Sequence, residues 1–184
     1  MNLNSNIYSL SESKDENNNY LRYYFISEGK ESIIKIIDYQ YIQEYEQQNI
    51  YNLAFGNYDA ENDIVVDDAN SNNGDVYPVF NTVLASIPAF FEIFPNDKII
   101  VQGSDGTQDF FKKCKQNCIK NCKVDKCRKF NQRLKIYKGY VDKNYDDLIR
   151  EYKFYGGFRD EFQNSYLEDY MKNKDYFSVV VEKI

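Results

Sequence analysis

The most regular pattern of apolar positions lies between residues 79 and 103. Its large apolar side chains are separated by steps of three and four residues, so they share one face of a helix. Phe90 widens this face, and its width predicts a helix that packs on a sheet. Pro88 predicts a bend or break near Ser86, because proline removes a backbone hydrogen bond. The residues of the face are Phe80, Val83, Leu84, Ile87, Phe91 and Phe94.

Both ends of this helix carry recognisable signals. Asp75 is predicted as its N-cap, and the segment Pro95-Asn96-Asp97 is predicted to end it. The apolar run at residues 99–101 then predicts a short buried strand. Residues 103–106 predict a connection to another helix and not a phosphate-binding loop, because no Walker lysine follows.

Three runs rich in Ile, Tyr and Phe precede the helix and predict β-strands. These runs, at residues 21–29, 32–42 and 49–59, are expected to form an antiparallel meander. Residues 64–66 predict a further short strand. The polar residues 1–19 predict a mobile N-terminal lead.

The remaining chain completes an α+β pattern. Residues 107–140 are helical in pattern, and residues 148–158 and 176–182 predict strands. We expect a mostly antiparallel sheet of about five to six strands, with two main helices on one face and a helical insertion at about residues 107–130. Residues 20–184 are expected to form a single domain. Its predicted core contains Phe80, Val83, Leu84, Ile87, Phe91, Ile100 and Val180.

Composition narrows the possible functions. Hydrophobic residues make up 42% of the 184, which excludes a wholly disordered chain. The chain has no histidine, which excludes Ser-His-Asp and Cys-His catalysis and mixed Cys/His zinc sites. We find no signal-peptide pattern and no run approaching the ~18 apolar residues of a membrane span. We therefore expect a cytoplasmic protein without a membrane partner, whose cysteines are thiols or metal ligands.

The charges of the chain are strongly segregated. The segment from Lys112 to Lys138 holds eleven Lys or Arg and one acid, Asp125, so it carries +10 in a chain of net charge −6. Three interpretations are open: a basic arm that binds nucleic-acid phosphates, a helix face attracted to the protein's own acidic surface, or a dock for an acidic partner protein. The candidate binding residues are Lys112, Lys113, Lys115, Lys120, Arg128, Lys129, Arg133 and Tyr137.

All four cysteines lie in this segment, at Cys114, Cys118, Cys122 and Cys127. Structural zinc sites usually use Cys-x2-Cys pairs separated by a longer loop. Four thiols within fourteen residues can still surround one zinc ion if residues 121–126 form a turn. Otherwise they are small apolar groups on the inner face of two helices, with a disulfide as the third interpretation. Zinc is therefore the one candidate cofactor.

Four segments, in this order, resemble an uncharacterised bacterial family known mainly from Bacteroidetes. They are NIYNLAFGNYD, SNNGDVYPVFNTVLASIPAFFEIFPNDKIIVQGS, RLKIYKGYVDKNYDDLIREYKFYG and YFSVVVEK. The resemblance covers about residues 20–184 and implies the fold and a bacterial cytosol, but no activity. The chain departs from the family pattern by about twenty extra residues between Ser104 and Arg133, which include all four cysteines.

Two functions fit these observations. The first is a small interaction module without catalysis, acting through the basic helical arm on nucleic acid or an acidic partner protein. The second is a nuclease-like enzyme or toxin–antitoxin component that uses Arg and Tyr groups near the strand end at Gly103. Convergence of Arg133 and Tyr137 with Ser104 and Asp105 in a cleft would favour the enzyme.

Overall fold

The computed structural model describes residues 6–66, 73–106, 108–117, 122, 127, 130–159 and 165–184. The chain forms two compact units, residues 1–99 and 100–184. The described residues contain nine strands, three α-helices and one short 3-10 helix, which confirms an α+β fold. The predicted five to six strands were too few, because several polar segments also pair as strands.

The first unit is an antiparallel meander with one helix. Strands β1 to β4 pair in chain order, and β5 pairs with β4. Strand β1 lies within the predicted N-terminal lead, so part of that lead belongs to the sheet. The elements are β1 (Ser11–Lys14), β2 (Tyr20–Ser27), β3 (Ile33–Tyr45), β4 (Gln48–Asp59), β5 (Ile64–Val66) and α1 (Val76–Ile93).

A two-residue turn joins β3 to β4. Tyr45 pairs with Gln48, and both residues between them have positive φ, 51° at Glu46 and 64° at Gln47. Two consecutive positive φ values are typical of a type I′ turn, whose twist matches that of the two flanking strands. The turn therefore sets the register of the long β3–β4 hairpin.

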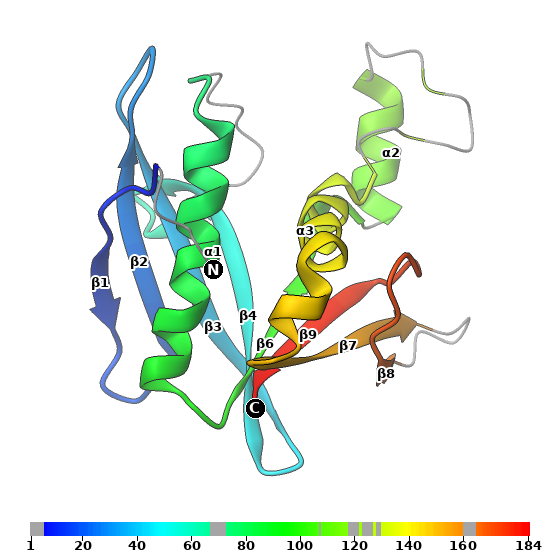
Figure 1. Ribbon diagram of the computed structural model, residues 1–184. Coiled ribbons are helices and arrows are strands. Elements are labelled where there is room, and N and C mark those ends of the chain that lie inside the picture. Colours follow the sequence, from blue (N-terminus) through cyan, green and yellow to red (C-terminus); the bar gives the residue numbers. More distant parts are fainter. Residues whose placement is uncertain are drawn as a thin grey trace. The chain divides into compact units, whose positions relative to one another are not determined.

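Helix α1 packs on one face of this meander (Figure 1). Phe90 is fully buried, and its ring centroid lies 4.7 Å from that of Tyr39 on β3 and 5.3 Å from that of Tyr51 on β4. Of the predicted core residues in α1, three are buried as expected and two are half-buried. The buried ones are Val83, Leu84 and Phe91, and the half-buried ones are Phe80 and Ile87.

One prediction for α1 needs correction, and another is confirmed in position only. The helix runs unbroken through Pro88, so the predicted break near Ser86 is absent. Asp75 occupies the N-cap position but makes no side-chain capping bond there. Its carboxylate instead accepts hydrogen bonds from the hydroxyls of Tyr8, at 2.8 Å, and Ser27, at 2.7 Å. Asp75 thus ties the start of α1 to β2 and to the N-terminal segment.

Among the described residues, α1 is also the one helix with the length and hydropathy of a membrane span. This finding contradicts the expectation that no run approaches that length. Core helices of soluble proteins share this composition. The packing of Phe90 and Phe94 against Tyr51 gives the apolar residues of α1 a role within the unit.

The second unit places α3 against an antiparallel group of strands in which β7 pairs with both β8 and β9 (Figure 1). Strand β7 begins later than predicted because α3 continues to Leu148. Val180 is buried as predicted, whereas Ile100 is half-buried. The elements are β6 (Lys98–Gln102), which spans the boundary between the units, η1 (Ser104–Gly106), α2 (Gln108–Asn117), α3 (Gln132–Leu148), β7 (Tyr152–Arg159), β8 (Ser165–Asp169) and β9 (Ser178–Lys183).

Candidate functional site

Helix α2 carries the start of the predicted basic arm. Lys112, Lys113 and Lys115 are all exposed, whereas Phe111 and Cys114 are half-buried. Lys112 and Lys113 lie on the side of the helix away from Phe111 and Cys114, whereas Lys115 is one turn after Phe111 and close to the same side. All three lysines are nevertheless exposed.

The inner side of α2 lies against the short segment that precedes α3. The rings of Phe111 and Phe130 meet edge to face, with centroids 6.1 Å apart. The Sγ atoms of Cys114 and Cys127 lie 3.0 Å apart, which is longer than a disulfide bond. The backbone N–H of Phe130 donates to the carbonyl of Cys127 at 3.1 Å, so the two residues that contact α2 are also bonded to each other.

Asp105, in the 3-10 helix η1, positions the start of α3. One oxygen of its buried carboxylate accepts hydrogen bonds from the backbone N–H groups of Gln132, at 2.7 Å, and Arg133, at 3.1 Å. The carbonyl of Asp105 accepts the N–H of Asn131 at 3.0 Å. These bonds satisfy N–H groups that have no partner within the helix, as a capping side chain does. The structure thus brings Asp105 and Arg133 together through the backbone of Arg133.

Arg133 and Tyr137 lie one turn apart on α3, and both are half-buried. Burial raises the pKa of the Tyr137 hydroxyl to about 12, although the charge of Arg133 acts in the opposite direction. The phenol is consequently protonated near neutral pH, where it can donate a hydrogen bond but does not act as a base.

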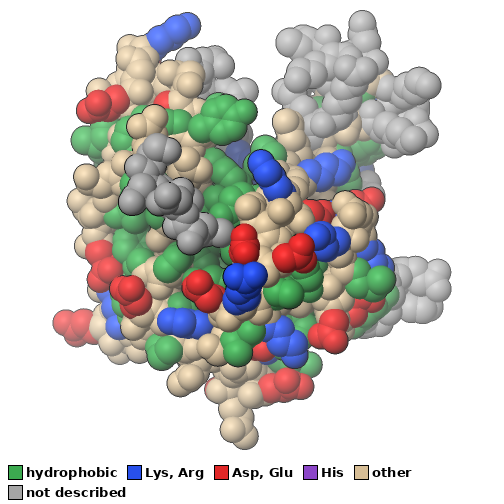
Figure 2. Space-filling model, viewed as in Figure 1, with side chains coloured by type: hydrophobic (Ala, Val, Ile, Leu, Met, Phe, Trp, Pro, Cys, Tyr) green, Lys and Arg blue, Asp and Glu red, His purple; other side chains and the backbone are tan. Residues whose placement is uncertain are grey.

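Several predicted site residues fall outside the described part of the chain. They are Lys120, Arg128, Lys129 and Cys118. On the face drawn in Figure 2, basic and acidic side chains are interspersed over the surface that is not grey.

Two of the predicted zinc ligands, Cys114 and Cys127, are in contact. Within the described ranges, no group of three or more His, Cys, Asp or Glu side chains is placed to hold one metal ion. Two thiols are fewer than the four ligands of a structural zinc site, so the described residues do not by themselves form one.

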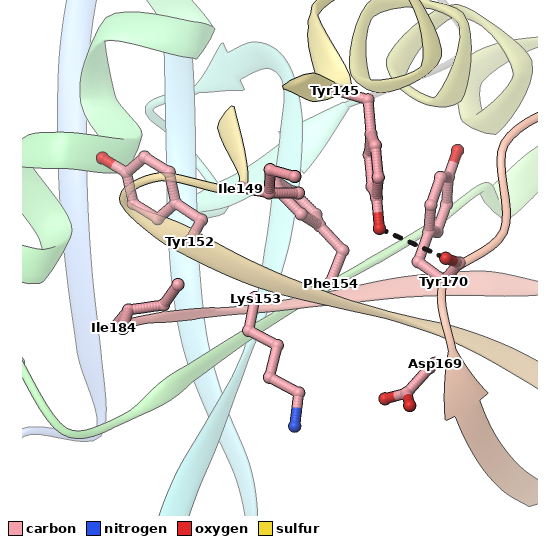
Figure 3. A pocket seen from close by; sticks show the side chains of 8 residues that line it. All are labelled: Tyr145, Ile149, Tyr152, Lys153, Phe154, Asp169, Tyr170 and Ile184. Atoms are coloured by element: carbon pink, nitrogen blue, oxygen red, sulfur yellow. Dashed lines mark hydrogen bonds between the residues drawn. The ribbon is translucent and has the colours of Figure 1, made fainter. Parts of the chain in front are cut away.

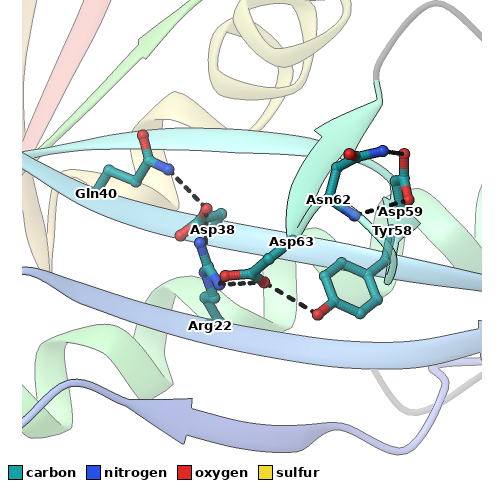
Figure 4. Close-up of polar contacts among 7 residues, drawn as sticks. All are labelled: Arg22, Asp38, Gln40, Tyr58, Asp59, Asn62 and Asp63. Atoms are coloured by element: carbon teal, nitrogen blue, oxygen red, sulfur yellow. Dashed lines mark hydrogen bonds and ion pairs between the residues drawn. The ribbon is translucent and has the colours of Figure 1, made fainter.

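A partly buried ionic cluster in the first unit was not predicted from the sequence (Figure 4). Arg22 on β2 is opposite Asp38 on β3, and its Nε lies 3.3 Å from Oδ2 of that buried carboxylate. The same guanidinium donates from Nη1 to both oxygens of Asp63, at 2.8 and 3.0 Å. Asp63 lies in the turn between β4 and β5, so Arg22 links this turn to two neighbouring strands.

The pKa values of the two carboxyl groups in this cluster are shifted in opposite directions. Burial raises the pKa of Asp38 above its usual value, although Arg22 and a hydrogen bond from Gln40 oppose the shift. Hydrogen bonds from Arg22 and Tyr58 hold the pKa of Asp63 below its usual value. The sequence signal for the cluster was Asp38, an acid between the apolar residues Ile37 and Tyr39 of β3. Its partner Asp63 could not be found without the tertiary structure.

The second unit has a surface hollow of about 330 Å³ beside β7. Figure 3 shows Tyr145 and Tyr170 on one side of β7 and Lys153 and Asp169 on the other. The Tyr145 hydroxyl donates to the carbonyl of Tyr170 at 3.3 Å. The aromatic side chains of Tyr145 and Tyr170 lie on the other side of β7 from the charged groups of Lys153 and Asp169. The hollow therefore suits contact with an apolar group more than acid–base chemistry. The lining residues are Tyr145, Ile149, Tyr152, Lys153, Phe154, Asp169, Tyr170 and Ile184.

Comparison with known proteins gives one match. Residues 4–110 match the model of a protein family that is described as a family of unknown function. No curated protein and no solved structure matches the chain. The family match ends inside α2, two residues before Lys112, and it shows a family of unknown function over these residues.

Proposed function

The chain belongs to this family of unknown function, DUF6934, and we propose that the protein binds nucleic acid through α2 and does so without catalysis. Lysine ammonium groups bind phosphate oxygens as point charges, and the bound cations of the nucleic acid are released. The α2 lysines would supply such contacts whatever the base sequence.

The observation that carries this proposal is the exposure of three lysines on an anchored helix. Lys112, Lys113 and Lys115 lie within four consecutive positions and are all exposed. The contacts of Phe111 and Cys114 with Phe130 and Cys127 anchor the helix. The charges are thus presented from a fixed element, within the segment that carries +10 in sequence.

The proposed binding is independent of base sequence. Specific recognition of bases requires groups that reach base edges or stack on bases. Phe111 directly precedes the α2 lysines in sequence, and its ring packs on Phe130. Phosphate contact by lysine supports affinity and not sequence preference.

Gel retardation of single- and double-stranded probes at several salt concentrations tests the proposal. The triple variant Lys112→Gln, Lys113→Gln, Lys115→Gln should lose at least about tenfold in affinity. Its log–log salt slope should become shallower by about 2–3, because each phosphate contact contributes about 0.7–0.9. The matched control replaces three other exposed lysines by Gln, namely Lys30, Lys143 and Lys183, and removes the same charge.

Equal losses in the two triple variants, or no binding of any probe at low salt, would contradict the proposal. Stronger binding to polyglutamate than to nucleic acid at the same ionic strength would indicate an acidic protein partner instead. Denaturing gels of the same mixtures with added magnesium test the nuclease-like alternative, and intact probes support binding without cleavage.

A further inference from the structure

We infer that Cys114 and Cys127 are a redox pair, which a peroxide converts to an intramolecular disulfide that fastens α2 to the chain immediately before α3. This inference concerns the thiols alone and does not depend on what α2 binds.

Geometry selects this pair. Their Sγ atoms lie 3.0 Å apart although the residues are thirteen positions apart in sequence. A disulfide measures about 2.0 Å, so bond formation requires an approach of only about 1 Å. Both residues are half-buried, so a small oxidant can reach the sulfur atoms while larger reagents are restricted.

The surrounding contacts hold the two sulfur atoms in place. Phe111 lies one turn before Cys114 on α2, and Phe130 lies three residues after Cys127. These two rings pack edge to face. The backbone N–H of Phe130 also donates to the carbonyl of Cys127 at 3.1 Å, which joins the ring-bearing residue to the thiol-bearing one. The pair is thus aligned by aromatic packing that does not involve the cysteines themselves.

The chemistry balances with hydrogen peroxide as oxidant. One thiolate attacks a peroxide oxygen, becomes a sulfenic acid and releases hydroxide, which leaves as water after protonation. The second sulfur then attacks the sulfenic sulfur, and the S–S bond forms as the sulfenic oxygen leaves as a second water. Two electrons pass from the two sulfurs to the peroxide. A dithiol reductant returns both thiols by exchange.

The consequence is a closed loop within the basic segment. The disulfide would close the chain from residue 115 to residue 126, which contains Lys115, Lys120, Lys123 and Lys126. Joining the ends of this loop reduces its conformational freedom. Oxidation would therefore change the mobility of part of the segment without changing its charge.

The experiment is peptide mapping of the full-length protein before and after treatment with a small molar excess of hydrogen peroxide. Peroxide should remove two hydrogens from the intact monomer mass, and the mapped linkage should join Cys114 to Cys127. Dithiothreitol should restore the original mass. A dominant linkage through Cys118 or Cys122, or covalent dimers, would overturn the inference.

Two double variants serve as matched controls. Cys118→Ser with Cys122→Ser leaves the proposed pair and should oxidise at about the wild-type rate. Cys114→Ser with Cys127→Ser leaves the other two thiols and should lose at least about tenfold in rate. Equal rates in the two variants would overturn the inference, and circular dichroism beforehand checks that both are folded.

Metal analysis of protein purified without chelator completes the test. One tightly bound zinc per chain that protects Cys114 and Cys127 from peroxide would assign these thiols to a metal site and overturn the inference. Metal-free protein that forms the Cys114–Cys127 linkage supports it.

Discussion

The hydroxyl of Tyr39, on β3, lies 2.7 Å from Oγ of Ser86 in α1, and both residues are fully buried. Ser86 donates its own hydrogen to the carbonyl of Val83 at 2.7 Å. Tyr39 is therefore the donor in the bond with Ser86. This relay joins the sheet to the helix two residues before Pro88, where the helix lacks a backbone donor.

We predict that Tyr39→Phe destabilises the protein by about 1 kcal/mol, because it removes a buried hydrogen bond and keeps the ring. Tyr41→Phe is the matched control on the same strand, since Tyr41 is 42% exposed, and should change stability by less than about 0.5 kcal/mol. Urea denaturation of the three proteins measures the difference. Equal stabilities of the two variants would count against the relay.

The packing of α1 depends on Phe90. Its ring centroid lies between 4.7 and 5.3 Å from those of Tyr39, Tyr51, Phe91 and Phe94. We predict that Phe90→Ala lowers the free energy of unfolding by about 3–5 kcal/mol, through lost burial and the cavity left behind.

Tyr77→Ala on the same helix is the control for Phe90, because Tyr77 is 82% exposed. This change should stay within about 0.5 kcal/mol. Thermal or urea denaturation measures the stability of both variants. A small effect of Phe90→Ala would contradict the arrangement of α1 on the meander.

Asp142 on α3 joins this helix to the connection between β8 and β9. It accepts hydrogen bonds from Lys138 and Tyr170, both at 2.7 Å, and from the N–H of Asn173 at 3.2 Å. Burial alone would raise the pKa of its carboxyl, but these donors outweigh that effect and hold the pKa below the ordinary value of 3.8. We predict that Asp142→Asn costs about 2 kcal/mol near pH 7, the usual scale for hydrogen bonds to a charged group.

The pH dependence of that loss follows from the direction of the shift. Because the folded pKa is lower than the unfolded one, the stabilisation is complete above about 3.8 and disappears as the pH falls through the folded value. Urea denaturation from about pH 7 to about pH 2.5 should therefore show Asp142→Asn and wild type converging in acid. Asp146→Asn is the control, since Asp146 has an 86% exposed side chain. A gap that stays constant across this range would argue against the assignment.

Two glycines of the second unit should respond oppositely to alanine. A Cβ at Gly156, on β7, would overlap ring carbons of Tyr176, so the ring must move. A Cβ at Gly139, inside α3, meets no atom within 4 Å. We predict that Gly156→Ala destabilises by at least about 1–3 kcal/mol through overpacking. Gly139→Ala should stabilise by about 0.5–1 kcal/mol through helix propensity. Thermal denaturation of the two variants shows whether each change raises or lowers stability. A stabilising Gly156→Ala would contradict the contact with Tyr176.

The local pattern of the sequence was sufficient for the main elements. The spacing of Val83, Leu84 and Phe91 predicted α1 and its buried face, because a helix places residues three and four positions apart on one side. The runs rich in Ile, Tyr and Phe predicted β2, β3 and β4, because the preference of β-branched and aromatic residues for strands is also a local property. The count of charged residues likewise located the basic segment, which also contains all four cysteines.

Long-range pairings needed the tertiary structure. Arg22 and Asp63 are 41 residues apart, and Cys114 and Cys127 have two other cysteines between them in sequence. Nothing in the local pattern ranks one charge partner or thiol partner above another, because such choices depend on strand register and on the path of the connecting turns. The sequence by itself determined which faces are apolar and which segment is basic. Only the folded chain decided which polar side chains meet, since that requires elements distant in sequence to be brought to within a few ångströms of each other.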